Sequence, residues 1–271
     1  MRNLLLVVAT ALAALAAPCV AVAGTVPSAA PVAAQATPAP WNDSLEFGGS
    51  TDSLTNGRPS QDQEYLAASE RGTAGRPTYY EQGLSQNQYG FHDDSLMAGT
   101  VLHAAQRVLL GAELSLSPTH IVLPSFDGTA SLEERFGAGF GTAVSFERKT
   151  YTTVNASTEG FTLDRYVRQY YFAYRPTFAQ LTGTPGTAVT HDLSVTRYDN
   201  RGGNLTVNWY GGRDVESTGA SSVLVLNVSG VSLRGHQVVA PNVAIAYGFE
   251  TYNEGSLYSA TGAHLGLRFV L

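Results

Sequence analysis

The last eleven residues, 261 to 271, alternate apolar and small or polar side chains without a break. Successive side chains of an extended strand point to opposite sides, so this segment has one fully apolar face. That face consists of Ala263, Leu265, Leu267, Phe269 and Leu271. An apolar strand face that reaches the final residue is typical of the closing strand of a transmembrane β-barrel.

The other end of the chain has the pattern of an export signal. Arg2 precedes an apolar run from Leu4 to Ala17, and Ala21 to Ala23 forms a small-residue cleavage site. We predict a signal peptide over 1–23. The run is shorter than the roughly 20 residues of a membrane-spanning helix. Cys19, the single cysteine, lies inside the predicted signal peptide; a lipidated N-terminus at Cys19 is the alternative, which Pro18 disfavours.

The mature chain divides into a leader and one large domain. Residues 24–40 are rich in Ala and Pro and carry no charge, which predicts a flexible leader. Residues 41–271 are expected to form the barrel domain, because all-β barrels of this size are single units.

Short segments of strand character follow one another, separated by Gly, Asn, Asp and Pro turns. We predict an all-β fold, a transmembrane antiparallel up-and-down barrel of about 12–14 strands. The expected strands are 43–54, 62–73, 77–91, 95–105, 107–117, 130–139, 142–153, 159–168, 170–181, 189–199, 203–213, 222–237, 242–252 and 257–271. In 222–237 the apolar positions change phase near Ser229 and Gly230, which predicts a β-bulge there, with two shorter strands as the alternative.

The predicted connections alternate in length, as outer-membrane barrels require of periplasmic turns and external loops. The short ones are 139–141, 168–169, 199–203 and 240–242, and the longer ones are 117–129, 153–159, 181–189 and 214–221. Asp93 and Asp94 are expected at a solvated hairpin tip.

Composition favours a membrane barrel over a soluble periplasmic barrel that binds a ligand, which is the alternative. Charged residues make up 14% of the chain, below the roughly 25% of soluble domains, and Lys149 is the only lysine. The net charge of −6 offers no basic patch, so nucleic acid is not an expected partner. Aromatic residues fall toward the predicted strand ends, which favours interfacial girdles. They are Trp41, Tyr79, Tyr80, Tyr151, Tyr166, Tyr170, Tyr198, Trp209, Tyr247, Tyr252 and Tyr258.

In four motifs, and in the order of these motifs, the chain resembles the YaiO family of outer-membrane β-barrel proteins. The resemblance covers most of the chain after about residue 62. The four motifs are SLSPTHIVLP (115–124), LDRYVRQYYFAYRPTF (163–178), HDLSVTRYDNRGGNLTVNWYGGRDVE (191–216) and GAHLGLRFVL (262–271). Leu271 and Asp214 depart from the family, which tends to have an aromatic residue and a glutamate there. The resemblance implies a Gram-negative envelope component of the outer membrane, and it supplies no catalytic residues.

Function is expected to depend on the barrel lumen and the external loops, as a narrow pore or a docking surface for an envelope protein or polysaccharide. The expected partners are outer-membrane lipid and lipopolysaccharide and, during insertion, the barrel-assembly machinery. Charged side chains of both signs are predicted to line the lumen, where they would pair or set a field. The lumen set is Glu113, Arg135, Glu147, Arg175, Asp192, Glu250, His264 and Arg268, and the external-loop set is Ser117, Pro118, His120, Pro124 and Asp127.

Enzyme chemistry and cofactors are not expected. No two of the six histidines have the spacing of two metal ligands on one strand or helix, so no metal site is predicted. A lipid or glycan hydrolase active at the barrel rim is the alternative, because Ser117, His120 and Asp127 are the residue types of a nucleophile, a base and an orienting acid.

Overall fold

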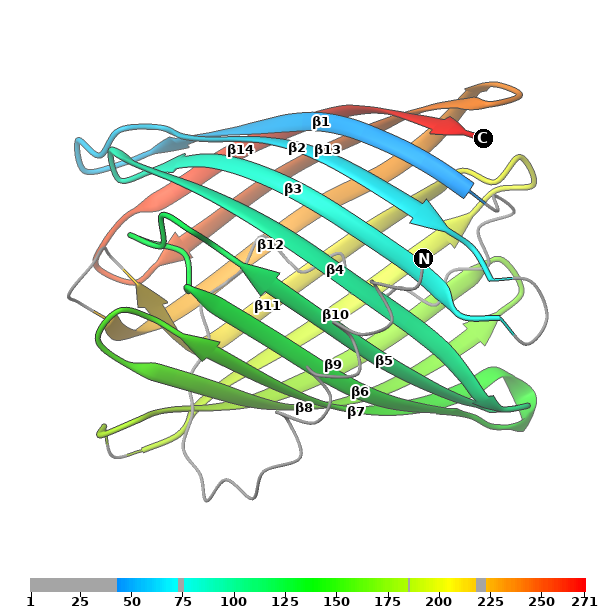
Figure 1. Cartoon of the computed structure of the whole chain (residues 1–271), viewed down its shortest axis with the longest axis horizontal. Helices are drawn as coiled ribbons and strands as arrows, with labels where there is room; N and C mark the ends of the chain where they lie inside the picture. The colour runs from blue at the N-terminus through cyan, green and yellow to red at the C-terminus, as the bar shows by residue number, and fades with distance from the viewer. Residues whose placement is uncertain (1–42, 73–75, 185, 218–222) are drawn as a thin grey trace.

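Fourteen antiparallel strands form a closed barrel in the computed structural model (Figure 1). The structure describes residues 43–72, 76–184, 186–217 and 223–271. The predicted signal peptide, the leader and Trp41 lie outside these residues. The strands are β1 (Asp43–Leu54), β2 (Gln61–Glu70), β3 (Thr78–Gln88), β4 (Phe91–Ala105), β5 (Val108–Leu116), β6 (Phe126–Arg135), β7 (Phe140–Thr150), β8 (Asn155–Val167), β9 (Tyr170–Leu181), β10 (Ala188–Tyr198), β11 (Asn204–Ser217), β12 (Val223–Ala240), β13 (Val243–Glu254) and β14 (Ser259–Val270).

Each strand pairs with its neighbours in sequence, and β1 pairs with β14 to close the ring. The closing register runs from Ser44 opposite Val270 to Leu54 opposite Ala260. The predicted fold class is therefore confirmed, and the fourteen predicted ranges overlap the fourteen observed strands in order, with 77–91 also reaching the first residue of β4. Closure leaves no sheet edge along this register, so the backbone groups of the first and last strands are satisfied by one another.

The two faces of the wall differ in character. Large apolar side chains on one face are exposed, among them Leu66 (54% exposed), Phe249 (54%) and Leu265 (66%). The other face carries contacts between strands that are not neighbours, such as Arg135 on β6 with Asp164 on β8. Such a contact requires the concave side of a closed sheet, because side chains diverge on the convex side. The polar face therefore lines the lumen and the apolar face lies outside.

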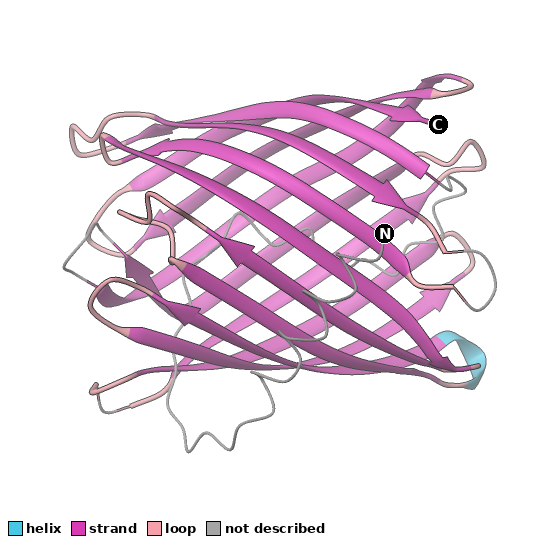
Figure 2. Ribbon diagram, in the orientation of Figure 1, coloured by secondary structure: helices cyan, strands magenta, loops and turns pink. Residues whose placement is uncertain are grey.

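The two ends of the barrel differ in their connections. At the end where β14 finishes, strands β4 and β5, β8 and β9, and β12 and β13 are joined by two residues each: 106–107, 168–169 and 241–242. We call this the short end. A single 3-10 turn, Gly137–Gly139, joins β6 to β7 there (Figure 2). The opposite end, the loop end, carries longer links at 117–125, 151–154 and 182–187. The predicted asymmetry is present, with three exceptions. At the short end 71–77 is long and 199–203, predicted as a short link, has five residues, while 89–90 is tight at the loop end.

The predicted bulge in β12 is wrong. The pairing of β12 with β11 continues through Ser229 and Gly230, and the register shift lies at Val238 to Ala240, against β13. The alternation of inward and outward positions continues without interruption through Ser229 and Gly230, while the apolar residues that predict a bulge occupy inward positions before Ser229 and outward positions after Gly230. Val231 is exposed on the outer face, whereas Val228 is buried on the inner face. Apolar packing inside the barrel therefore produced the apparent slip.

Within the described part of the chain, no helix has the length and apolar character needed to cross a membrane.

Candidate functional site: the inner wall

The inner wall carries more negative than positive charge. In the described strands, alternation places at least twelve carboxylates on this face against five lysine or arginine side chains. The carboxylates include those of Glu46, Asp52, Asp93, Glu113, Asp127, Glu133, Glu147, Asp164, Asp192, Asp214, Glu250 and Glu254, and the cations are Arg135, Lys149, Arg175, Arg234 and Arg268. Charges removed from bulk water require partners, so how they pair determines what the wall presents to a solute.

All eight residues predicted to line the lumen lie on this face: Glu113, Arg135, Glu147, Arg175, Asp192, Glu250, His264 and Arg268. Two of them pair across neighbouring strands, with 3.8 Å between Arg175 Nη2 and Asp192 Oδ2. Asn208 Nδ2 also donates to this carboxylate at 2.9 Å. Sequence reasoning missed Glu46 and Tyr65, although the alternation of 43–54 already places Glu46 opposite the apolar face that includes Leu45 and Phe47.

Glu46 is the centre of a first group of contacts, at the β1–β14 seam. Tyr65 Oη donates to Glu46 Oε1 at 2.7 Å, and His236 Nε2 lies 3.2 Å from Glu46 Oε2. Arg268 Nε lies 4.0 Å from the same oxygen. The Tyr65 ring stacks on His264 with centroids 5.5 Å apart. These residues come from β1, β2, β12 and β14, so the group fastens the seam from inside.

A second group surrounds Lys149 on β7. Its ammonium lies 3.0 Å from Glu147 Oε1 and 3.7 Å from Asp127 Oδ2, and the residue is only 3% exposed. Glu113 on β5, which β6 separates from β7, accepts a hydrogen bond of 2.9 Å from Tyr80 Oη. One cation thus serves a region that contains three carboxylates, and this part of the wall is acidic.

A third group lies at the short end, where Arg135 contacts Glu133 and Asp164. Its Nη1 is 2.5 Å from Asp164 Oδ1, and its guanidinium carbon lies 5.1 Å from the ring centroid of Tyr166. The ion pair crosses β7 above Gly141. A Cβ at Gly141 would lie 2.7 Å from Asp164 Oδ2 and 2.9 Å from Arg135 Nη1. The absence of a side chain there makes room for the pair.

The three residues of the hydrolase alternative do not form a catalytic arrangement. Ser117 Oγ accepts a hydrogen bond of 3.0 Å from the backbone N–H of His120. His120 Nδ1 lies 3.1 Å from the carbonyl oxygen of Pro118. Asp127, predicted in the external loop, lies in β6, and its carboxylate faces Lys149 in the lumen. The placement of Asp127 in a loop is therefore wrong, because β6 begins four residues earlier than the predicted 130.

The remaining loop residues, Ser117, Pro118, His120 and Pro124, do lie in the 117–125 loop at the loop end. This loop is held by Asp93, which is 1% exposed in β4. The Asp93 carboxylate accepts backbone N–H groups of Ile121 at 2.8 Å, Val122 at 2.6 Å and Leu123 at 2.9 Å. The expectation of a solvated hairpin tip at Asp93 is wrong, because β4 extends past β5 and the loop covers the extension.

The predicted aromatic girdle is only partly correct. Tyr79, Tyr170, Trp209 and Tyr247 occupy outward positions, but Tyr80, Tyr166, Tyr198 and Tyr252 occupy inward ones. Tyr151 and Tyr258 are buried in loops. The sequence shows that these rings lie near strand ends. Whether a ring points outward or inward depends on the phase of its strand, which the structure provides.

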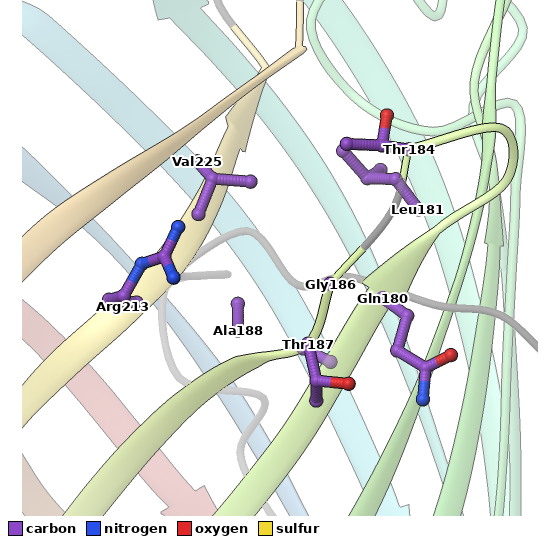
Figure 3. Close-up of a pocket in the computed structure, with 9 residues that line it drawn as sticks. Gln180, Leu181, Thr184, Gly186, Thr187, Ala188, Arg213 and Val225 are labelled. Atoms are coloured by element: carbon purple, nitrogen blue, oxygen red, sulfur yellow. The ribbon is translucent and has the colours of Figure 1, made fainter.

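A small pocket opens at the loop end, between the ends of β9 to β12 (Figure 3). Leu181, Ala188, Val225 and the stem of Arg213 line it. It adjoins a cluster of buried apolar side chains that includes Tyr151. The pocket offers one cation and no carboxylate, so it adds little to the chemistry of the wall. Among the described residues, no group of three His, Cys, Asp or Glu side chains is placed to hold a metal ion.

No family model and no curated protein matches this chain. Solved structures do match it. The CymD monoaromatic hydrocarbon channel is similar with a TM-score of 0.59 and 7% identity, over 93% of this chain and 95% of that one. The toluene transporter TodX of Pseudomonas putida gives 0.53 and 8%, over 85% and 90%. Omp33, an outer membrane protein of Acinetobacter baumannii, gives 0.50 and 10%, over 85% and 98%. At these identities the similarity is one of fold: the chain has the fold of outer-membrane β-barrels.

Proposed function

We propose that this protein is an outer-membrane β-barrel of the YaiO type that forms a narrow passive channel with a preference for small cations. Residues 1–23 would direct export and be removed, and the barrel-assembly machinery would insert the mature chain among outer-membrane lipid and lipopolysaccharide. The apolar outer face supports this location, because water would not favour so many exposed large apolar side chains. We propose no enzymatic activity.

The observation that carries the proposal is the carboxylate excess of the inner wall. A charged wall enriches counter-ions and repels co-ions, and rings of Asp and Glu favour cations in channels. The excess is uneven. Around Lys149 the three carboxylates of Glu113, Asp127 and Glu147 face a single ammonium, while Arg234 and Arg268 lie on β12 and β14. A cation passing through the lumen would therefore be drawn toward the β5 to β7 side.

Ion currents through the refolded chain in a planar bilayer test this function. We expect ohmic steps from the heat-modifiable, folded protein. A double variant of the inner wall, Glu113→Gln with Glu147→Gln, should lower the permeability ratio of potassium to chloride severalfold, because it removes two of the negative charges that favour cations in the lumen.

The matched control removes two carboxylates from the outer face. Glu64→Gln with Glu81→Gln alters exposed outward positions on β2 and β3, so it should leave the permeability ratio unchanged. A folded barrel that gives no steps would refute the channel. Steps whose ratio responds equally to both double variants would refute the role of the inner carboxylates.

A further inference from the structure

Three tyrosine rings from consecutive strands lie together at the short end: Tyr166 on β8, Tyr171 on β9 and Tyr198 on β10. The centroids of Tyr166 and Tyr171 are 4.6 Å apart, and those of Tyr166 and Tyr198 are 6.4 Å apart with planes inclined by 24°. We call these three residues the tyrosine shelf. Contacts of this kind hold rings in fixed relative orientations.

The tyrosine shelf faces the lumen and is partly open to it. The chain neighbours Arg165, Tyr170 and Arg197 are exposed on the outer face, so alternation places the shelf residues inside. Each shelf residue is only half-buried. Anchoring at a membrane interface cannot explain rings on this side of the wall.

Hydrogen-bonding groups border the shelf. Arg135 lies over Tyr166 and contacts both Asp164 and Glu133, and the missing side chain of Gly141 gives this ion pair its path. The guanidinium, two carboxylates and the tyrosine hydroxyls thus place donors and acceptors beside aromatic faces.

We propose that the tyrosine shelf is a subsite that binds the pyranose ring of a neutral oligosaccharide on its way through the lumen. A pyranose has apolar C–H faces and hydroxyls around its edge, so it matches aromatic faces bordered by mixed donors and acceptors. A small metal ion would not require the aromatic rings for binding, and the surrounding carboxylates disfavour a polyanion. A hydrocarbon would have to desolvate the border charges without pairing them.

Binding of maltotriose to the full mature chain, folded in detergent, tests the subsite through saturation-transfer NMR titration. Tyr198→Ala and Tyr171→Ala should each weaken binding by about tenfold, which corresponds to 1.4 kcal/mol. Tyr198→Phe keeps the ring and should stay close to the wild type. Tyr170→Ala is the matched control, because Tyr170 is next in sequence to Tyr171 but 38% exposed on the outer face.

Mannitol separates ring stacking from general hydrogen bonding, since it has hydroxyls but no ring face. We expect no saturable mannitol signal. Equal binding of mannitol and maltotriose, or equal losses in Tyr198→Ala and Tyr170→Ala, would overturn the proposal. Transport through the lumen rests on the proposed function, but this binding measurement does not. Saturable maltotriose binding without ohmic steps would support the subsite and refute the channel. Ohmic steps without maltotriose binding would support the channel and refute the subsite.

Discussion

At the scale of single residues, this barrel depends on a few side chains that reach beyond their own strand. Asp93 accepts three backbone N–H groups of the 117–125 loop while almost fully buried. Charge-assisted hydrogen bonds of this kind are the strong ones, and the Val122 N–H among these donors is buried. The position of the loop therefore depends on one carboxylate.

Replacement of Asp93 by asparagine should release that loop. The amide offers one acceptor oxygen in place of two, so the three N–H groups cannot all be satisfied, at a cost of about 1–3 kcal/mol. Hydrogen exchange at the amides of Ile121, Val122 and Leu123 should accelerate. Asp94→Asn is the control, because the Asp94 side chain is 51% exposed and its carboxylate lies 3.4 Å from His92, which is not part of the 117–125 loop. Unchanged protection in Asp93→Asn would contradict the role given to Asp93.

A second prediction at this scale concerns Gly141. Valine there should displace the Arg135–Asp164 pair, because even its Cβ would come within 3 Å of both charged groups. Leaving a buried charge without its partner costs about 3–5 kcal/mol, and partial exposure of this pair lowers that figure. Gly83→Val is the control, since a Cβ at Gly83 meets nothing within 4 Å. The measurement is the free energy of unfolding of both variants in denaturant. Equal stability of Gly141→Val and Gly83→Val would contradict the crowding at Gly141.

At the scale of elements, strand phase explains both what the sequence predicted and what it did not. The terminal alternation placed Leu265 and Leu267 outside, and both are exposed there. In β12 the same reasoning failed, because Val228 packs inside the barrel and mimics a change of face. The partners of Glu46 could not be read from the sequence either. His236 reaches it from three strands away, and that contact depends on how the closed sheet is sheared.

The outer face of β14 makes a quantitative prediction. Leu267→Arg should destabilise the folded barrel in a bilayer by about 2–4 kcal/mol if the residue lies near the midplane, because the guanidinium would lose its water. Leu271→Arg is the control, since Leu271 lies past the end of β14 and is 80% exposed. The measurement is the fraction of heat-modifiable protein across a denaturant series in lipid vesicles. A Leu267→Arg variant as stable as the control would place this face outside the membrane.

At the scale of the whole molecule, the barrel combines an apolar outer wall with an inner wall of excess negative charge. Closure by β1 and β14 separates these two surfaces completely along the strands. The outer wall suits hydrocarbon, where every backbone group must be satisfied within the sheet. The inner wall suits water and cations. Both properties arise from the same alternation of side chains along each strand, because successive residues point to opposite faces of the wall.

The zero-current potential of the wild-type protein in a planar bilayer reports directly on the charge selectivity of the lumen. With a tenfold gradient of potassium chloride, the dilute side should become positive, because potassium crosses faster than chloride. A dilute side that becomes negative would show that chloride crosses faster, and it would contradict the role assigned to the carboxylates of the inner wall.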